Sequence, residues 1–113
     1  MTRSVHAVIG VLTLALAAPL LAEDAVARGK QLYEEQKCRM CHSVGGVGNP
    51  KGVALDEVGG KNTKEVLKSW LTNPKEMAQK TGSTRKPPMK SYATLPAADV
   101  DALVSYLSTL RKK

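Results

Sequence analysis

The feature that most constrains this chain is the pentapeptide Cys38-Arg39-Met40-Cys41-His42, which contains both of its cysteines. Two thiols three residues apart can each add to one of the two vinyl groups of haem, forming two thioether bonds. His42 is then held beneath the iron, where its imidazole can serve as an axial ligand. The other histidine of the chain, His6, lies near its start. The motif predicts one covalently bound haem c, attached through Cys38 and Cys41.

Three other uses of a C-x-x-C pair explain the sequence less well. A thioredoxin-like redox pair needs a βαβ pattern around it, and no alternating strand pattern is visible here. A closed zinc site needs more ligands than two cysteines and one histidine easily supply. A disulfide across two intervening residues would be strained and would leave His42 without a role. Haem attachment uses all three side chains.

The first 22 residues differ in composition from the rest. Arg3 gives a short basic start, the 16 residues from Ala7 to Ala22 carry no charge, and Glu23-Asp24 follows. This layout is typical of a secretory signal peptide, here cleaved after Ala22, and the apolar run is short for a membrane span of about 20 residues. We expect a periplasmic protein. If the segment is not cleaved, it would anchor the chain to the membrane.

Residues 23–113 are then expected to form one small domain. The chain has no Phe, one Trp and three Tyr, so few aromatic side chains are available for its core. A domain of this size often needs an additional constraint, such as a disulfide or a bound metal, to be stable. Without Arg3, 16 Lys and Arg stand against 10 Asp and Glu. This basic excess favours an acidic protein partner. No nucleic-acid-binding motif is visible, and we expect no nucleic-acid partner.

Hydrophobic periodicity predicts an all-α fold with three main helices. The first covers residues 24–37. The second is capped by Thr63 and ends or kinks at Asn73-Pro74. The last covers about residues 96–110. The apolar faces of the three helices are, in order, Val26, Gly29 and Tyr33; Val66, Leu67, Trp70 and Leu71; and Val100, Leu103, Val104, Leu107 and Leu110.

Long loops join these helices. Residues 43–60 contain six glycines and a proline, and residues 81–91 contain Lys86-Pro87-Pro88-Met89. Structureless loops of this length are uncommon in a compact domain. We therefore expect them to wrap around the haem.

The second axial ligand has to come from a methionine or a lysine if the leader containing His6 is removed. Met40 lies inside the attachment motif and cannot reach the opposite face of the haem. Met77 follows Pro74 in a predicted helical turn, where a packing or surface role is the ordinary interpretation. Met89 lies in a loop braced by two prolines, which can hold its thioether against the iron. We predict Met89 as the ligand, with Met77, a lysine or an open iron site as alternatives.

These residues resemble class I monohaem cytochromes c over nearly all of residues 24–111. Gly29 and Tyr33 are similar to the glycine and the aromatic residue of that family's first helix. Leu103 and Tyr106 are similar to the residues of the last helix that cross them. The family's middle helix and its methionine loop are matched by Trp70-Leu71-Thr72-Asn73-Pro74 and by Lys86-Pro87-Pro88-Met89-Lys90-Ser91-Tyr92.

One position departs from the family pattern. After the haem histidine the family often has a proline whose carbonyl accepts the imidazole N–H, and Val53 stands at that place within Gly52-Val53-Ala54-Leu55. A backbone carbonyl is still available there. We expect the hydrogen bond to survive and the loop to be less rigid.

The resemblance implies a one-electron carrier rather than an enzyme. With His42 and Met89 both bound, iron has no free position for a substrate, and methionine ligation favours a positive potential. We expect redox protein partners with an acidic docking surface, no small-molecule substrate, and a monomer. Candidate docking residues are Lys37, Lys51, Lys86 and Lys90. The alternatives are an electron-transfer subunit of a larger oxidoreductase complex, or an open-site haem enzyme if Met89 is not a ligand.

Overall fold

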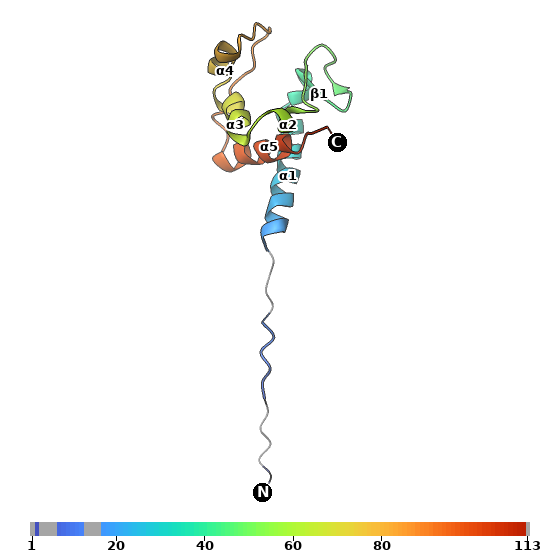
Figure 1. Ribbon diagram of the computed structural model, residues 1–113, viewed down its shortest axis with the longest axis vertical. Helices are drawn as coiled ribbons and strands as arrows, with labels where there is room; N and C mark the ends of the chain where they lie inside the picture. Colours follow the sequence, from blue (N-terminus) through green and yellow to red (C-terminus); the bar gives the residue numbers. More distant parts are fainter. Residues whose placement is uncertain (1, 3–6, 13–16, 113) are drawn as a thin grey trace.

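The computed structural model describes residue 2, residues 7–12 and residues 17–112. Figure 1 shows the arrangement of the elements in these ranges. They are α1 (Ala17–Glu35), the 3-10 helix η1 (Cys38–Met40), β1 (His42–Val44), β2 (Val47–Gly48), β3 (Val53–Ala54), α2 (Val58–Lys61), α3 (Lys64–Thr72), α4 (Pro74–Thr81) and α5 (Ala97–Ser108).

The predicted signal peptide, residues 1–22, lies partly outside the described residues, because residues 1, 3–6 and 13–16 are not among them. Helix α1 begins at Ala17 and runs without a break past the predicted cleavage point after Ala22. Among the described residues, no helix combines the length and the apolar character needed to cross a membrane.

The main packing contact of the fold is the crossing of α1 and α5. Gly29 lies at the crossing, where a Cβ atom would come within 2.0 Å of the Ala102 carbonyl oxygen and 2.7 Å of the Tyr106 Cβ. The two helices can approach this closely only because Gly29 has no side chain. Next to this contact, the rings of Tyr33 and Tyr106 pack edge to face, with centroids 5.7 Å apart.

The core surrounds this crossing. Leu32 and Leu103 are its most deeply buried large side chains, each 1% exposed. Leu67 and Leu71 bring α3 against α5, and Val66 and Trp70 of the predicted stripe are half-buried. The core consists of Leu32, Tyr33, Leu67, Leu71, Tyr92, Val100, Ala102, Leu103, Val104 and Leu107.

The middle of the chain forms two helices where one, ended or kinked, was predicted. Helix α3 begins after Thr63, whose side-chain oxygen accepts a hydrogen bond from the Val66 N–H at 3.2 Å, as an N-cap does. It ends at Thr72, and Pro74 begins α4 at the first helical position, where proline needs no hydrogen-bond partner for its nitrogen. Met77 therefore lies within a helix.

The fold is helical, as predicted, and differs from an all-α arrangement of three main helices in two respects. The described residues form five α-helices, and they also contain a small three-stranded sheet of order β2-β1-β3. Strand β1 pairs antiparallel with β2 and parallel with β3. The sheet and α2 together occupy half of residues 43–60, the segment predicted as the first long loop. Strands of two or three residues are too short to show an alternating pattern, and α2 has the glycine-rich sequence Val-Gly-Gly-Lys.

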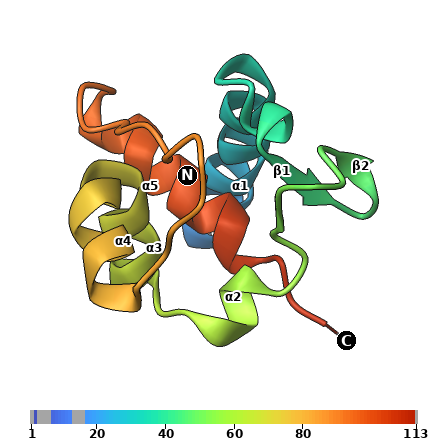
Figure 2. The ribbon, with the colours of Figure 1, turned by 90° about the horizontal axis from the view of Figure 1, so that it is seen from above.

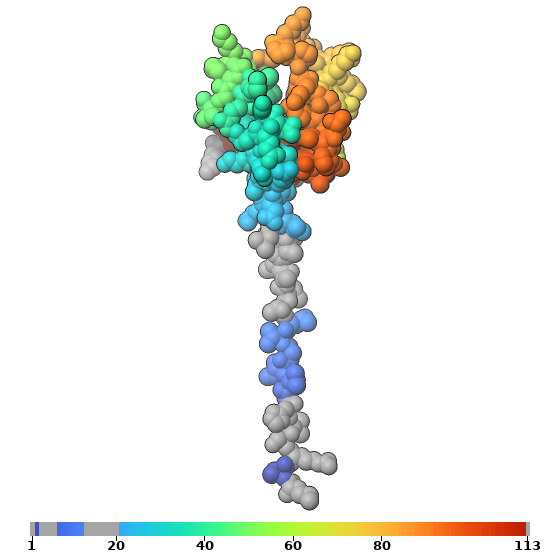
Figure 3. Space-filling view, turned by 180° about the vertical axis from the view of Figure 1, so that it is seen from behind, coloured from blue at the N-terminus to red at the C-terminus, as the bar shows by residue number. Residues whose placement is uncertain are grey.

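The elements place the attachment motif and the methionine loop at the same end of the molecule. Figure 1 shows β1 and the loop after α4 both at the end away from the N-terminal segment. Seen from above in Figure 2, α3 and α4 lie on one side and β1 and β2 on the other, with α1 and α5 between them. Figure 3 shows the same grouping on the opposite face, where cyan and green atoms of the motif region lie beside the orange atoms of the later loop.

Candidate haem site

The attachment motif follows directly from α1. Lys37 adopts a left-handed conformation with φ of 57°, which turns the chain out of the helix, and Cys38–Met40 then forms η1. The Cys41 N–H donates to the Cys38 carbonyl at 3.1 Å and closes this turn. Cys38 is half-buried and packs against the core, while Cys41 is exposed, and neither forms a disulfide. The turn thus presents the two sulfur atoms from one short rigid segment.

His42 is held by a hydrogen bond through one of its ring nitrogens. It begins β1, and its Nδ1 lies 2.9 Å from the Val53 carbonyl oxygen on β3. A carbonyl can only accept, so the proton is on Nδ1 and the lone pair of Nε2 is free to bind a metal. The hydrogen bond predicted for Val53 in place of proline is therefore present.

Asn49, a residue for which no role was predicted, ties the loop between β2 and β3 to the attachment motif. The Asn49 N–H donates to the Arg39 carbonyl at 3.0 Å, and its side-chain amide donates to the Met40 carbonyl at 3.0 Å. Its side-chain oxygen accepts from the Lys51 N–H at 2.9 Å, an Asx turn for which Asn49-Pro50 was the available sequence signal. These bonds stiffen the loop that lacks the family's proline.

The glycines of this loop allow it to lie against the motif. A Cβ at Gly52 would be 1.8 Å from the Cys41 carbonyl oxygen, and a Cβ at Gly48 would be 2.1 Å from that of His42. The backbone therefore passes both motif residues more closely than any side chain would permit. The glycine content of this segment predicted a loop, and the close approach to the motif has no separate signal in the sequence.

Met89 lies in the loop between α4 and α5, at the same end of the molecule. It is half-buried and packs against the core cluster, as Cys38 does. Two hydrogen bonds anchor the loop just after Met89 to the end of α3: the Tyr92 N–H donates to the Leu71 carbonyl at 2.7 Å, and the Ser91 hydroxyl donates to the Thr72 carbonyl at 3.0 Å. Met77 is half-buried on α4, and Met40 is 66% exposed in η1.

The surroundings of Cys38 are apolar but contain tyrosine hydroxyls. Burial raises the pKa of the Cys38 thiol, and a hydrogen bond with Tyr92 and the charge of Lys90 oppose this effect. Burial, followed by the nearby Cys38, raises the pKa of Tyr92 and of Tyr33 to about 12. The Tyr33 hydroxyl is buried and has no hydrogen-bond partner among the described residues. Buried polar atoms in folded proteins almost always have a hydrogen-bond partner, and that partner can be an ordered water rather than a protein group.

These residues fit a covalently held haem. Cys38 and Cys41 have the spacing for two thioethers, His42 has a free Nε2, and a half-buried thioether, Met89, packs against the same core as Cys38. A model of the cytochrome c family matches residues 26–111. The chain belongs to the cytochrome c family. The resemblance inferred from the sequence is confirmed, and with it a covalently attached haem c and a role in haem-based electron transfer.

One curated relative is a cytochrome c oxidase subunit 2 from Alkalihalophilus pseudofirmus, which is 31% identical over 97 residues. The match covers 79% of this chain but only 27% of the relative, so this cytochrome c spans about a quarter of that protein's length. No solved structure matches this chain.

Proposed function

We propose that this cytochrome c is a periplasmic one-electron carrier. Cys38 and Cys41 form the thioethers to haem c, and His42 and Met89 are the axial ligands of its iron. The observation that carries the proposal is the orientation of His42, which directly follows Cys41 in the chain. Its Nδ1 forms a hydrogen bond with the Val53 carbonyl, and its Nε2 is therefore available to the iron. When bound, the haem supplies the Fe(III)/Fe(II) couple.

The chain's own residues would set the properties of that couple. The Val53 carbonyl fixes the tautomer and the ring orientation of His42 and makes its Nε2 a better donor. Ser91 and Tyr92, bonded to the end of α3, hold the methionine loop so that Met89 can stay in place in both oxidation states. Ligation by a thioether favours Fe(II), and an apolar core disfavours the extra charge of Fe(III). We expect a positive reduction potential.

Charge near the methionine loop supports an acidic partner. Arg85, Lys86 and Lys90 are exposed in this loop, and Lys37 and Lys51 are exposed beside the attachment motif. The loop after α4 and strand β1, which follows the attachment motif, lie at the same end of the molecule (Figure 1), so an acidic protein that binds there would come close to the haem. The predicted signal peptide, residues 1–22, supports a periplasmic location, with a protein that begins at Glu23 after cleavage.

A second candidate function is supported by the curated relative. That relative is a subunit of cytochrome c oxidase and shares only about a quarter of its length with this chain. The same domain therefore occurs as part of a longer oxidase subunit. This favours, as the alternative, an electron-transfer subunit of a larger oxidoreductase complex. Gel filtration of native extract distinguishes the two, because a free carrier elutes at the size of a small domain.

The test of attachment is denaturing gel electrophoresis with haem staining. The wild-type protein should keep its haem through the gel and through acid–acetone extraction, because two thioether bonds hold it. Replacing both Cys38 and Cys41 with alanine should abolish this staining. Haem that washes out of the wild type would rule out the proposal.

The test of axial ligation is Met89→Ala, with Met77→Ala as the matched control. Met89→Ala should remove the far-red sulfur-to-iron band of the ferric protein, open the iron to carbon monoxide and lower the potential. Each tenfold change in the one-electron equilibrium corresponds to about 59 mV. Met77→Ala should leave the spectrum unchanged. The reverse pattern would assign the ligand to Met77, and an iron open to carbon monoxide in the wild type would favour a haem enzyme.

A further inference from the structure

Asn49 joins the attachment motif to the segment that leads into β3. It is half-buried, and its backbone N–H lies between two carbonyls of the motif, donating to that of Arg39 at 3.0 Å and to that of His42 at 3.1 Å. Its side-chain amide donates to the Met40 carbonyl at 3.0 Å. Three carbonyls within residues 39–42 thus accept hydrogen bonds from this one residue.

The oxygen atoms of Asn49 bind the chain that follows it. The side-chain oxygen accepts from the Lys51 N–H at 2.9 Å, and the backbone carbonyl accepts from the Gly52 N–H at 3.2 Å. Pro50, which lies between them, has no N–H to donate. Asn49 therefore directs its donor groups to the motif and its acceptor groups to residues 51 and 52, so that it links the two segments in both directions.

This link bears on the hydrogen bond of His42. Val53 directly follows Gly52, and its carbonyl oxygen lies 2.9 Å from the His42 Nδ1. Asn49 thus holds both sides of this contact: the backbone of His42 on one side and the residues just before Val53 on the other. The strength of a hydrogen bond falls steeply when its angle is disturbed, so it depends on how firmly the two backbones are held together.

The strength of this hydrogen bond affects the iron that His42 would ligate. A carbonyl that accepts from Nδ1 makes the imidazole a more basic ligand through Nε2, and a more basic ligand favours Fe(III) over Fe(II). Weakening the hydrogen bond should therefore raise the reduction potential. A loop that merely loosened would act in the opposite direction, because water entering the site would stabilise the extra positive charge of Fe(III). The sign of the change separates the two effects.

We infer that Asn49 is a positioning residue for the haem iron: it holds the Val53 carbonyl against the His42 Nδ1 and thereby lowers the reduction potential. Asn49 acts through His42 and does not touch the iron. The inference rests on the proposed function, because it requires His42 to be an axial ligand.

The experiment is a redox titration of the holoprotein with Asn49→Ala, using Asn62→Ala as the matched control. Asn62 is also half-buried, and its side-chain amide also donates to a backbone carbonyl, that of Val58 in α2, at 3.1 Å. Asn49→Ala should shift the one-electron equilibrium toward Fe(II) by about two- to fivefold, where tenfold corresponds to about 59 mV. Asn62→Ala should leave the potential unchanged. No shift in Asn49→Ala, a shift toward Fe(III), or equal shifts in both variants would overturn the inference.

Proton NMR of the ferrous protein measures the hydrogen bond itself. The His42 Nδ1 proton should exchange with solvent faster in Asn49→Ala than in the wild type, and at the wild-type rate in Asn62→Ala. Asn49→Ser retains an oxygen that can accept from the Lys51 N–H, so its effects on exchange and potential should be smaller than those of alanine. An Nδ1 exchange rate that is the same in Asn49→Ala and the wild type would contradict the inference, as would a larger effect of serine than of alanine.

Wild-type protein provides a test that needs no variant to fold. The His42 Nδ1 proton and the backbone amide protons of Asn49 and Lys51 should show the same free energy of opening in hydrogen exchange. An Nδ1 proton that exchanges while both amides stay protected would overturn the inference, because the His42 contact would then open independently of Asn49. Failure of the proposed function is recognised separately, since haem would then wash out of the wild type, whereas failure of the inference leaves haem attachment intact.

Discussion

At the scale of single residues, the hydrogen bond of His42 decides which of its ring nitrogens is free to bind a metal. The Val53 carbonyl accepts from Nδ1, so the chain fixes the tautomer before any partner or substrate is involved. A backbone carbonyl can do this whether the residue is valine or proline. What proline would add is stiffness, and here Asn49 supplies it through bonds to the backbone of Arg39 and Met40.

The buried tyrosines predict a loss of stability in alkali. A phenol in the unfolded chain ionises near pH 10, and burial raises the pKa of Tyr33 and Tyr92 to about 12. The folded state therefore holds these protons more tightly. Their contribution to stability is fully present below about pH 10 and is lost as the pH rises toward about 12.

Urea unfolding across this pH range measures the effect. The double variant Tyr33→Phe/Tyr92→Phe should show a shallower fall in the free energy of unfolding between about pH 10 and pH 12 than the wild type does. Lysine ionisation contributes equally to both proteins and cancels in the comparison. Parallel curves for the two proteins would contradict the expectation.

At the scale of helices, the α1–α5 crossing depends on the close approach at Gly29. Gly29→Ala would place a Cβ within 2.0 Å of the Ala102 carbonyl oxygen, so the helices would have to move apart. Overpacking of this kind costs about 1–3 kcal/mol or more, while the gain in helix propensity from glycine to alanine is only about 1 kcal/mol. We expect a net loss of stability, measured as a lower urea midpoint of the holoprotein.

Gly60→Ala is the matched control. Gly60 also lies in a helix, but an added Cβ would meet only the Arg111 side chain, at 3.9 Å. This substitution should leave stability unchanged or raise it slightly, because only the propensity effect remains. If both variants shift the urea midpoint equally, the close approach at Gly29 does not determine the stability of the α1–α5 crossing.

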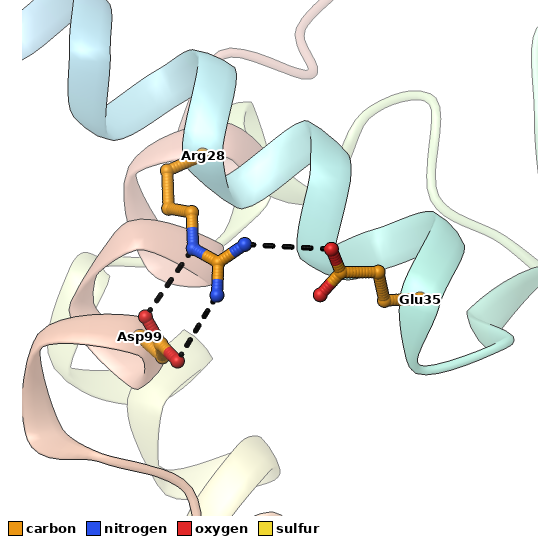
Figure 4. A network of polar contacts seen from close by, with 3 residues as sticks. All are labelled: Arg28, Glu35 and Asp99. Atoms are coloured by element: carbon orange, nitrogen blue, oxygen red, sulfur yellow. Dashed lines mark hydrogen bonds and ion pairs between the residues drawn. The ribbon is translucent and has the colours of Figure 1, made fainter.

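An ion-pair network also joins the two helices, and we expect it to contribute much less. Arg28 of α1 lies 3.4 Å from the Asp99 carboxylate of α5 and 3.5 Å from Glu35 (Figure 4). The Arg28 side chain is 40% exposed, so water and salt screen the pair. Arg28→Gln should cost less than about 1 kcal/mol and should lose its effect in high salt. A cost as large as that of Gly29→Ala would show that the network matters more than the packing.

The helices were predictable from the sequence and the sheet was not, for reasons visible in particular segments. Val100, Leu103, Val104 and Leu107 recur at helical spacing, and all four are buried in α5. The strands β1, β2 and β3 have three, two and two residues, too few for an alternating pattern to appear. Their pairing is set by tertiary contacts such as the Leu55 N–H donating to the Ser43 carbonyl at 2.8 Å.

The candidate site likewise has features that the sequence predicts and features that it does not. The spacing of Cys38, Cys41 and His42 indicates the chemistry directly, since the three residues are neighbours in the sequence. The burial of Tyr33 and Tyr92 in the core against which Cys38 packs depends on how α1 and the methionine loop pack together. Contacts of this kind join segments distant in the chain, and a single sequence carries no local signal for them.

At the scale of the whole molecule, one end carries both the attachment motif and exposed basic residues of the methionine loop. Arg85, Lys86 and Lys90 follow α4 at this end, as Figures 1 and 3 show for the loop as a whole. Lys112 lies after α5, next to Arg111, whose side chain lies near Gly60 of α2. The positive charge near the proposed haem can therefore be changed separately from charge elsewhere.

Because these charges can be changed separately, the rate of electron transfer to a small anionic oxidant such as ferricyanide tests which of them matter. Attraction between the basic end and the anion should make the reaction fast at low salt and slow it steeply as ionic strength passes about 0.1 M, where the screening length is about 10 Å. Lys86→Glu should reduce the rate at low salt and flatten its salt dependence. Lys112→Glu changes the net charge equally and should have a smaller effect. Lys90 is less suitable for the comparison, because it also lies over the Tyr92 ring. Stopped-flow measurements that find the two reversals equivalent would mean that total charge, and not charge near the haem, governs the encounter.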